Sequence, residues 1–237
     1  LFGGLAVFIY GMMQMGEALQ KAAGENMRRI LQLLTSNPLV GVLVGALVTM
    51  IIQSSSATTV MVIGFVSAGL MTLRQATGVI MGANIGTTVT AQIVAFDVED
   101  FSLPVLGVGV LLVFFGRSKR WRYAGHGLIG FGLLFLGMRT MKDSMSFLQD
   151  SRDLFLMFDS SPLLGVLAGT VLTMLVQASS ATIGLTMAMA AQGLLSLEAA
   201  LPILLGDNIG TTITAVLASL GSNRSAKQAA AAHVLFN

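Results

Sequence analysis

Two polar segments each occur twice within the long apolar stretches of this chain. Gln-Ser-Ser-Ser-Ala-Thr at 53–58 returns as Gln-Ala-Ser-Ser-Ala-Thr at 177–182, and Gly-Ala-Asn-Ile-Gly-Thr-Thr at 82–88 returns as Gly-Asp-Asn-Ile-Gly-Thr-Thr at 206–212. They supply hydroxyls and carboxamides but contain no Lys, Arg or His. Uncharged donors of this kind can solvate an oxyanion if cations bind beside it, because an uncompensated anion in an apolar setting is very costly.

These segments offer ligands for an anion and for a cation. A break in a helix would direct backbone N–H groups at an anion, whereas the carbonyls that end a helix suit a dehydrated Na⁺. The candidate anion ligands are Gln53, Ser54, Ser55, Ser56, Asn84, Gln177, Ser179, Ser180 and Asn208. The candidate Na⁺ ligands are Thr58, Thr87, Thr88, Thr182, Asp207, Thr211 and Thr212.

Asp207 is the only charged residue in the four segments, and Ala83 occupies the matching position of the first copy. An ionisable group in the middle of a membrane span indicates a functional role. We expect Asp207 to bind a cation directly or to take up a proton. The structural alternative is that it caps a broken helix by accepting from local N–H groups.

The polar segments belong to a longer internal repeat. Residues 38–96 align with residues 162–220 at a constant offset of 124 without a gap, and 11–15 loosely resembles 137–141. A general likeness of apolar helices does not explain polar segments at the same spacing in both copies. The chain therefore contains one structural unit twice.

Each repeat contains a helix that is too short to cross a membrane. Asn37-Pro38 and Ser161-Pro162 are helix-start signals. The helix that begins there reaches the polar segment after about 14 residues, or ~21 Å, which is less than a ~30 Å hydrocarbon core. We therefore expect re-entrant helical hairpins at 38–72 and 162–196, buried in protein or lining a cavity.

The helix after each hairpin, at 75–96 and 199–220, is long enough to cross, and Asn-Ile-Gly-Thr-Thr near its middle predicts an unwound turn. Small residues spaced by four, such as Gly41 with Gly45 and Gly165 with Gly169, predict close helix packing. The remaining expectations are membrane spans at 1–20, 101–116 and 123–142, and amphipathic charged segments at 21–36 and 143–159.

The charges predict a topology. If the first hairpin enters from the cytoplasm, ten of the 13 Lys and Arg residues lie on the cytoplasmic side, as the positive-inside rule requires. The acidic loop of Asp97, Glu99 and Asp100 is then outside. Three crossings separate the hairpins, so the second enters from the outer face and the repeats are inverted. Inverted repeats with broken helices at mid-membrane are typical of transporters.

The sequence thus predicts an all-α polytopic protein of the cell membrane with two inverted-topology repeats, each with a re-entrant hairpin and an unwound transmembrane helix. Residues 1–116 form the first repeat and a connecting span, and residues 117–237 form the second. The initial Leu1 and the apolar run that reaches Asn237 indicate a piece of a longer protein.

Composition excludes several other classes. With 54% hydrophobic and 10% charged residues, the chain does not read as a soluble domain, a disordered chain or a nucleic-acid binder. There is no Cys and only two His without ligand spacing, so we expect no transition metal. A serine hydrolase would need a base near its serine, and none occurs, so we expect no enzyme. An ion channel stays open as an alternative, although a channel filter normally comes from a ring of subunits.

The paired Gln-Ser-Ser-Ser and Gln-Ala-Ser-Ser segments, each followed by Gly-x-Asn-Ile-Gly-Thr-Thr, resemble the type II sodium–phosphate cotransporter family and its bacterial relatives over the whole chain. The resemblance implies transport of inorganic phosphate coupled to Na⁺ by alternating access, with phosphate at the paired segments and no cofactor. Ala178 departs from the pattern, because it removes the hydroxyl that Ser54 supplies in the first copy. Another oxyanion or a carboxylate as cargo, the direction of transport and a homo-oligomer stay open.

Overall fold

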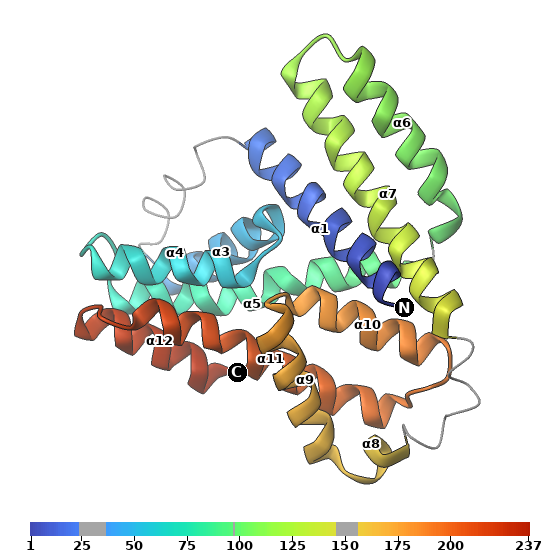
Figure 1. Ribbon diagram of the computed structural model, residues 1–237. Coiled ribbons are helices and arrows are strands. Elements are labelled where there is room, and N and C mark those ends of the chain that lie inside the picture. The colour runs from blue at the N-terminus through green and yellow to red at the C-terminus, as the bar shows by residue number, and fades with distance from the viewer. Residues whose placement is uncertain (24–36, 97, 146–155) are drawn as a thin grey trace.

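The computed structural model describes residues 1–23, 37–96, 98–145 and 156–237, which form helices and connecting loops without a strand (Figure 1). The expected charged segments at 21–36 and 143–159 fall largely outside the described residues, as does Asp97. The helices are α1 (Phe2–Ala23), α3 (Pro38–Ile52), α4 (Ser55–Ser67), α5 (Leu73–Ala95), α6 (Ser102–Phe115), α7 (Lys119–Met145), α8 (Leu156–Ser160), α9 (Pro162–Val176), α10 (Ser179–Ala191), α11 (Leu197–Ser219) and α12 (Arg224–Phe236), with a 3₁₀ turn at Glu99–Phe101.

Two helical hairpins, α3–α4 and α9–α10, turn at the two serine-rich segments. Pro38 and Pro162 begin the first arms, as the helix-start signals predict. Gln53 and Gln177 end these arms in the left-handed conformation, with φ of 59° and 57°. A left-handed residue is a common way to end a helix, and it lets the second arm start within two residues. We call the segments 53–56 and 177–180 the first tip and the second tip.

The long helices α5 and α11 run unbroken for 23 residues each, so the predicted unwound turns at Asn-Ile-Gly-Thr-Thr are wrong. The threonine hydroxyls of this segment donate to carbonyls of their own helix. Thr87 donates to Ala83 O at 3.2 Å, and Thr211 donates to Asp207 O at 2.9 Å. Such back-bonding is common for Ser and Thr inside helices.

The glycine of each Asn-Ile-Gly-Thr-Thr serves packing instead of a break. A Cβ added at Gly86 would lie 2.6 Å from Ala46 O, and one at Gly210 would lie 2.6 Å from Thr170 O. Backbone therefore touches backbone where α5 crosses α3 and where α11 crosses α9. The close packing predicted for the glycines of α3 and α9 is confirmed, because Gly45 and Gly169 also face the backbones of α5 and α11.

Helix α1 packs along α7 through a second set of glycines. A Cβ at Gly11 would lie 2.7 Å from Gly130 O, and one at Gly137 would lie 2.7 Å from Gly4 O. Helix α6 covers another side of α7. In Figure 1, α1, α7 and α6 form the upper right of the molecule, and the hairpins with α5, α11 and α12 form the rest.

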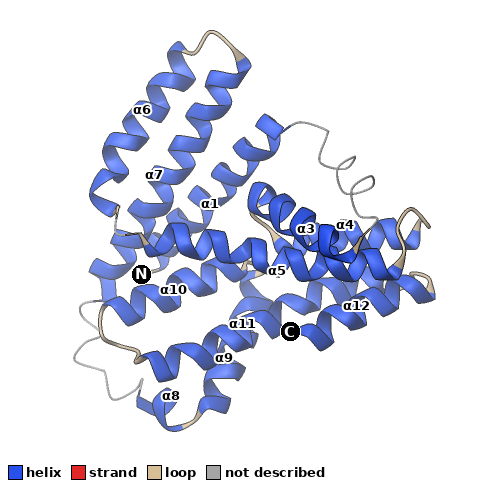
Figure 2. Cartoon of the chain, turned by 180° about the vertical axis from the view of Figure 1, so that it is seen from behind, coloured by secondary structure: helices blue, strands red, loops and turns tan. Residues whose placement is uncertain are grey.

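The bases of the two hairpins lie at opposite ends of the molecule. The connection from α4 to α5 lies beside the start of α12, where Asn223 Nδ2 donates to Ser67 O at 2.9 Å. The base of the second hairpin lies near α8, on the other side of both views (Figures 1 and 2). The two tips therefore approach each other from opposite ends. Among the described residues, α5 and α11 are long and apolar enough to cross a membrane, whereas the four hairpin arms are shorter apolar helices.

Candidate functional site

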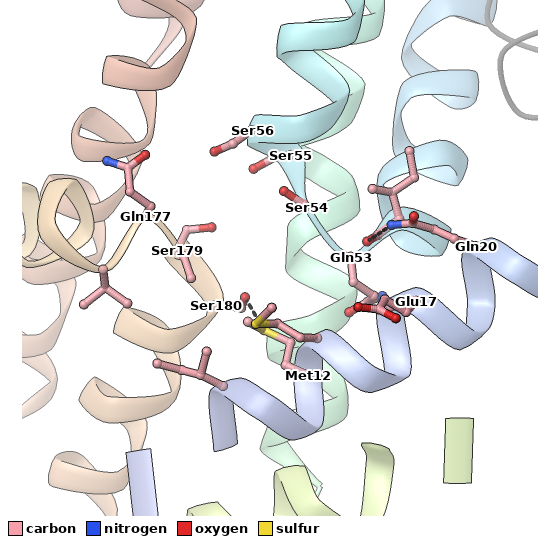
Figure 3. A pocket seen from close by; sticks show the side chains of 16 residues that line it. Met12, Glu17, Gln20, Gln53, Ser54, Ser55, Ser56, Gln177, Ser179 and Ser180 are labelled. Carbon is pink, nitrogen blue, oxygen red and sulfur yellow. Dashed lines mark hydrogen bonds between the residues drawn. The ribbon is translucent and has the colours of Figure 1, made fainter. Parts of the chain in front are cut away.

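The two tips meet near the middle of the molecule and, together with α1, enclose a cavity of about 330 Å³ (Figure 3). Seven of the nine candidate anion ligands line this cavity, although they come from segments 124 residues apart in the sequence. They are Gln53, Ser54, Ser55, Ser56, Gln177, Ser179 and Ser180. Figure 3 shows the serines of the first tip facing Gln177 and Ser179 of the second.

The first tip is held by its own side chains. Ser54 caps α4 by accepting from Ala57 N at 3.1 Å. Gln53 donates its amide to Met50 O and accepts from the Thr90 hydroxyl of α5 at 2.7 Å. The amide of Gln53 is therefore oriented by partners in α3 and α5. The hydroxyls of Ser55 and Ser56 belong to the first turn of α4.

The second tip is less constrained. Ala178 precedes α10 and provides no side-chain cap, so the first N–H groups of α10 receive no side-chain acceptor at this position. Gln177 is exposed and donates to Met174 O at 2.5 Å. Ser180 is buried and donates its hydroxyl to the sulfur of Met12 in α1. The loss of one hydroxyl predicted from Ala178 thus leaves an uncapped helix N-terminus beside the cavity.

Near its tip, each hairpin contains a buried pair of threonines, one from each arm. Thr49 donates to Thr58 at 3.0 Å in the first hairpin, and Thr173 lies 2.8 Å from Thr182 in the second. In the second hairpin only, a carboxylate joins the pair. Thr173 donates to Asp207 Oδ1 at 2.7 Å, and Asp207 is 2% exposed.

Asp207 does not cap a broken helix, because α11 is continuous around it. Its carboxylate holds the hydroxyl of a neighbouring helix, so it links α11 to the first arm of the second hairpin. Ala83 at the matching place in α5 gives the first hairpin no such link. The two halves thus differ in charge at corresponding positions.

The structure does not bring the other candidates to the cavity wall. Asn84 donates to Asn237 of α12 at 2.5 Å, and Asn208 is exposed. Thr87, Thr88, Thr211 and Thr212 all donate to carbonyls of their own helices. Their placement follows from the continuity of α5 and α11, which keeps the whole Asn-Ile-Gly-Thr-Thr segment helical.

Helix α1 supplies a wall of the cavity that sequence reasoning missed. Met12, Gly16, Glu17 and Gln20 all line it. Glu17 is the only charged side chain that lines this cavity in the described part of the chain, and it pairs with Lys21 at 3.1 Å. A signal was present, since Gln14, Glu17 and Gln20 recur every three residues in an apolar span, which places polar groups near one face of a helix.

The cavity is therefore built from neutral donors with little fixed charge of its own. An anion bound there would be solvated by hydroxyls, carboxamides and the N-termini of α4 and α10. No three His, Cys, Asp or Glu side chains gather as metal ligands within the described ranges.

The model of one protein family, described as Na⁺/Pi-cotransporter, matches residues 7–143 and 145–236. This match covers both tips, both long helices and α1. The chain belongs to the Na⁺/Pi-cotransporter family. Members of this family are transporters, so the chain is a transport protein and not an enzyme.

The chain is also similar to individual proteins, two of which are named for phosphate transport or export. The chain is 35% identical over 233 residues to "Uncharacterized protein YqeW" of Bacillus subtilis, covering 97% of this chain and 76% of the relative. It is 27% identical over 239 residues to "Putative inorganic phosphate export protein YjbB" of Escherichia coli, covering 100% of this chain and 44% of that protein. It is 41% identical over 97 residues to human "Sodium-dependent phosphate transport protein 2B", covering 40% of this chain and 14% of that protein. No solved structure matches the chain.

Proposed function

We propose that this chain moves inorganic phosphate across the cell membrane together with Na⁺ by alternating access, with phosphate held between the two tips. The observation that carries the proposal is that both tips line one cavity of about 330 Å³. The family and two of its named relatives support phosphate as the cargo, and the human relative supports Na⁺ as the coupling ion.

The phosphate site is built from donors. Helices α4 and α10 both begin at the cavity, and the first N–H groups of a helix lack intrahelical acceptors. These N–H groups and the serine hydroxyls can surround the phosphate oxygens, with Gln53 and Gln177 on the flanks. Because no Lys or Arg lines the cavity in the described residues, bound cations must offset the phosphate charge.

In this proposal the Na⁺ ions bind at the buried threonine pairs of the two hairpins. The oxygens of Thr58 in the first hairpin and of Thr182 and Asp207 in the second are buried and do not line the cavity. Oxygen ligands suit a hard cation, and a carboxylate adds charge attraction. Asp207 makes the second position the stronger of the two.

The two halves act as inverted repeats that enter from opposite membrane faces. Two features support this. The hairpin bases lie at opposite ends of the molecule (Figure 1), and the α1–α7 crossing pairs Gly4 with Gly137 and Gly11 with Gly130, as a twofold relation between the two helices requires. Large exposed apolar side chains on the first arms, such as Leu39 and Leu163, fit a lipid-facing surface.

Flux measurements on purified protein in liposomes test this function. With Na⁺ outside, radiolabelled phosphate should accumulate above its external concentration, and the accumulation should stop when K⁺ replaces Na⁺ or when a Na⁺ ionophore is added. Efflux from preloaded vesicles is measured in parallel, because one relative is named for export. Downhill flux without accumulation would indicate a channel. Stronger inhibition by sulfate or a dicarboxylate than by unlabelled phosphate would indicate another cargo.

A further inference from the structure

Helix α1 lies outside both hairpins but contacts both tips. Gln20 donates its side-chain amide to Ile52 O, the last residue of α3, at 3.2 Å. About two turns earlier in α1, Met12 accepts a hydrogen bond from the hydroxyl of Ser180 in the second tip. Figure 3 shows these contacts on one side of the cavity. One helix is therefore hydrogen-bonded to the second tip and to Ile52, the residue that directly precedes the first tip.

The contact with the first tip is close along the backbone as well as through Gln20. Gly16 lies one turn before Gln20, and a Cβ there would lie 3.1 Å from Ile52 O and 3.2 Å from Gln53 Cβ. Such distances are tighter than ordinary van der Waals contact. The glycine therefore permits the approach, and the Gln20 amide satisfies a carbonyl that the end of α3 leaves without an intrahelical donor.

The location of Ile52 fixes the geometry that follows it. The left-handed Gln53 comes next, and α4 begins two residues later at Ser55. On its other side α1 is fixed to α7 by backbone contact at Gly4 and Gly11. A tip that is bonded to α1 is thereby set at a defined place relative to the second tip.

We propose that Gln20 is a positioning residue of the transport site: its amide holds the end of α3 against α1 and so sets the separation of the two serine tips. The proposal rests on the proposed function for its consequence on phosphate, but not for the contact itself. Gln20 acts through the first tip and needs no contact with the cargo.

The first test compares Gln20→Met with Gln14→Met. Both replace a glutamine of α1 by an unbranched side chain of similar length, but Gln14 does not line the cavity between the two tips. Loss of one hydrogen bond should raise the KM for phosphate about fivefold in Gln20→Met while kcat stays within about twofold. Gln14→Met should match the wild type. An unchanged KM in Gln20→Met would overturn the proposal.

A second pair of variants probes the same contact without touching Gln20. Gly16→Ala places a methyl group against Ile52 and Gln53, whereas Gly3→Ala on the same helix meets nothing within 4 Å. Gly16→Ala should raise the KM for phosphate at an unchanged melting temperature, and Gly3→Ala should leave both unchanged. Equal KM values for the two alanine variants would contradict the proposed role of α1.

A third measurement does not depend on the cargo. The chain has no native cysteine, so Ser56→Cys provides a single thiol on the first tip. Its rate of reaction with a membrane-impermeant maleimide should change several-fold when Gln20→Met is added, but not when Gln14→Met is added. If the wild type transports no phosphate, the proposed function fails, while this rate still decides whether Gln20 positions the tip. Equal rates in the three proteins would refute the positioning role.

Discussion

At the scale of single residues, the serines of the two tips are the groups on which phosphate binding depends in our proposal. Ser55 is buried at the start of α4, and Ser179 begins α10. Each hydroxyl would donate to a charged oxygen, an interaction worth about 1.5–3 kcal/mol. Ser55→Ala and Ser179→Ala should therefore each lower Na⁺-driven phosphate uptake at least about tenfold.

Ser219→Ala is the matched control, because Ser219 is also a buried helical serine but donates only to Val216 O of its own helix. Uptake by Ser219→Ala should be near that of the wild type. Equal uptake in all three variants, at equal protein levels in the liposomes, would remove the tips from the site.

Asp207 allows a prediction about the cation. Asp207→Asn keeps an oxygen that can accept from Thr173 but removes the negative charge. If the carboxylate binds Na⁺, the Na⁺ concentration for half-maximal uptake should rise about tenfold at an unchanged melting temperature. A Na⁺ curve that does not shift would leave Asp207 with the structural task of linking α11 to α9.

The sequence identified the residues of the tips because two copies of a polar segment in apolar surroundings are informative by type and spacing. It failed for Asn84 and Asn208, since a sequence does not say which side of a continuous helix faces a cavity. It also missed Gln20 and Glu17, because α1 carries no counterpart of the serine segments.

At the scale of elements, the hairpin arms and long helices lie where the sequence placed them, but the unwound turns do not exist. Asn-Ile-Gly-Thr-Thr contains a glycine and two threonines, which are compatible with a break and equally with a packed helix. Whether the segment breaks or stays helical depends on a partner helix. Here Gly86 and Gly210 lie against the backbones of α3 and α9, and the segment stays helical. A contact between segments 40 residues apart is not visible in local sequence.

This packing predicts a stability effect. A Cβ at Gly206 would collide with the Val166 carbonyl and lie 2.8 Å from Thr170 N, so Gly206→Ala should cost about 1–3 kcal/mol by overpacking. The measurement is the melting temperature in detergent. Gly64→Ala in α4 is the control, because a Cβ there meets nothing within 4 Å and alanine favours a helix by about 0.5–1 kcal/mol. A Gly206→Ala protein that melts like the control would contradict the tight backbone contact between α9 and α11 at this position.

At the scale of the whole molecule, the charge pattern predicts which loops share a membrane side. Single cysteines at Lys119 and Arg224 should react with an impermeant reagent only from the cytoplasmic side, and one at Asp100 only from outside. Asp100 is suitable because its side chain is 93% exposed and its pair with Arg139 at 3.5 Å is a surface contact of little energetic weight. Labelling of Asp100→Cys and Lys119→Cys from the same side would contradict the inverted arrangement.

The overall architecture was accessible from sequence to the extent that the repeat and the apolar lengths define it. Helices at the expected spans and turns at both tips follow from proline, glycine and polar residues whose effects are local. The meeting of the tips was expected from the symmetry of the repeats. The size of the cavity and the role of α1 as its third wall depend on the angles between helices, which local rules do not set.

The glycine contacts join the helices into three stiff pairs, α3 with α5, α9 with α11 and α1 with α7. Within each pair the two backbones are in direct contact, so no layer of side chains between them can deform. We therefore expect each pair to move as one rigid unit. The cavity lies where the three pairs meet, with α1 against the end of α3 and against the second tip. A small rotation of one pair against the other two would therefore change the shape of the cavity between them.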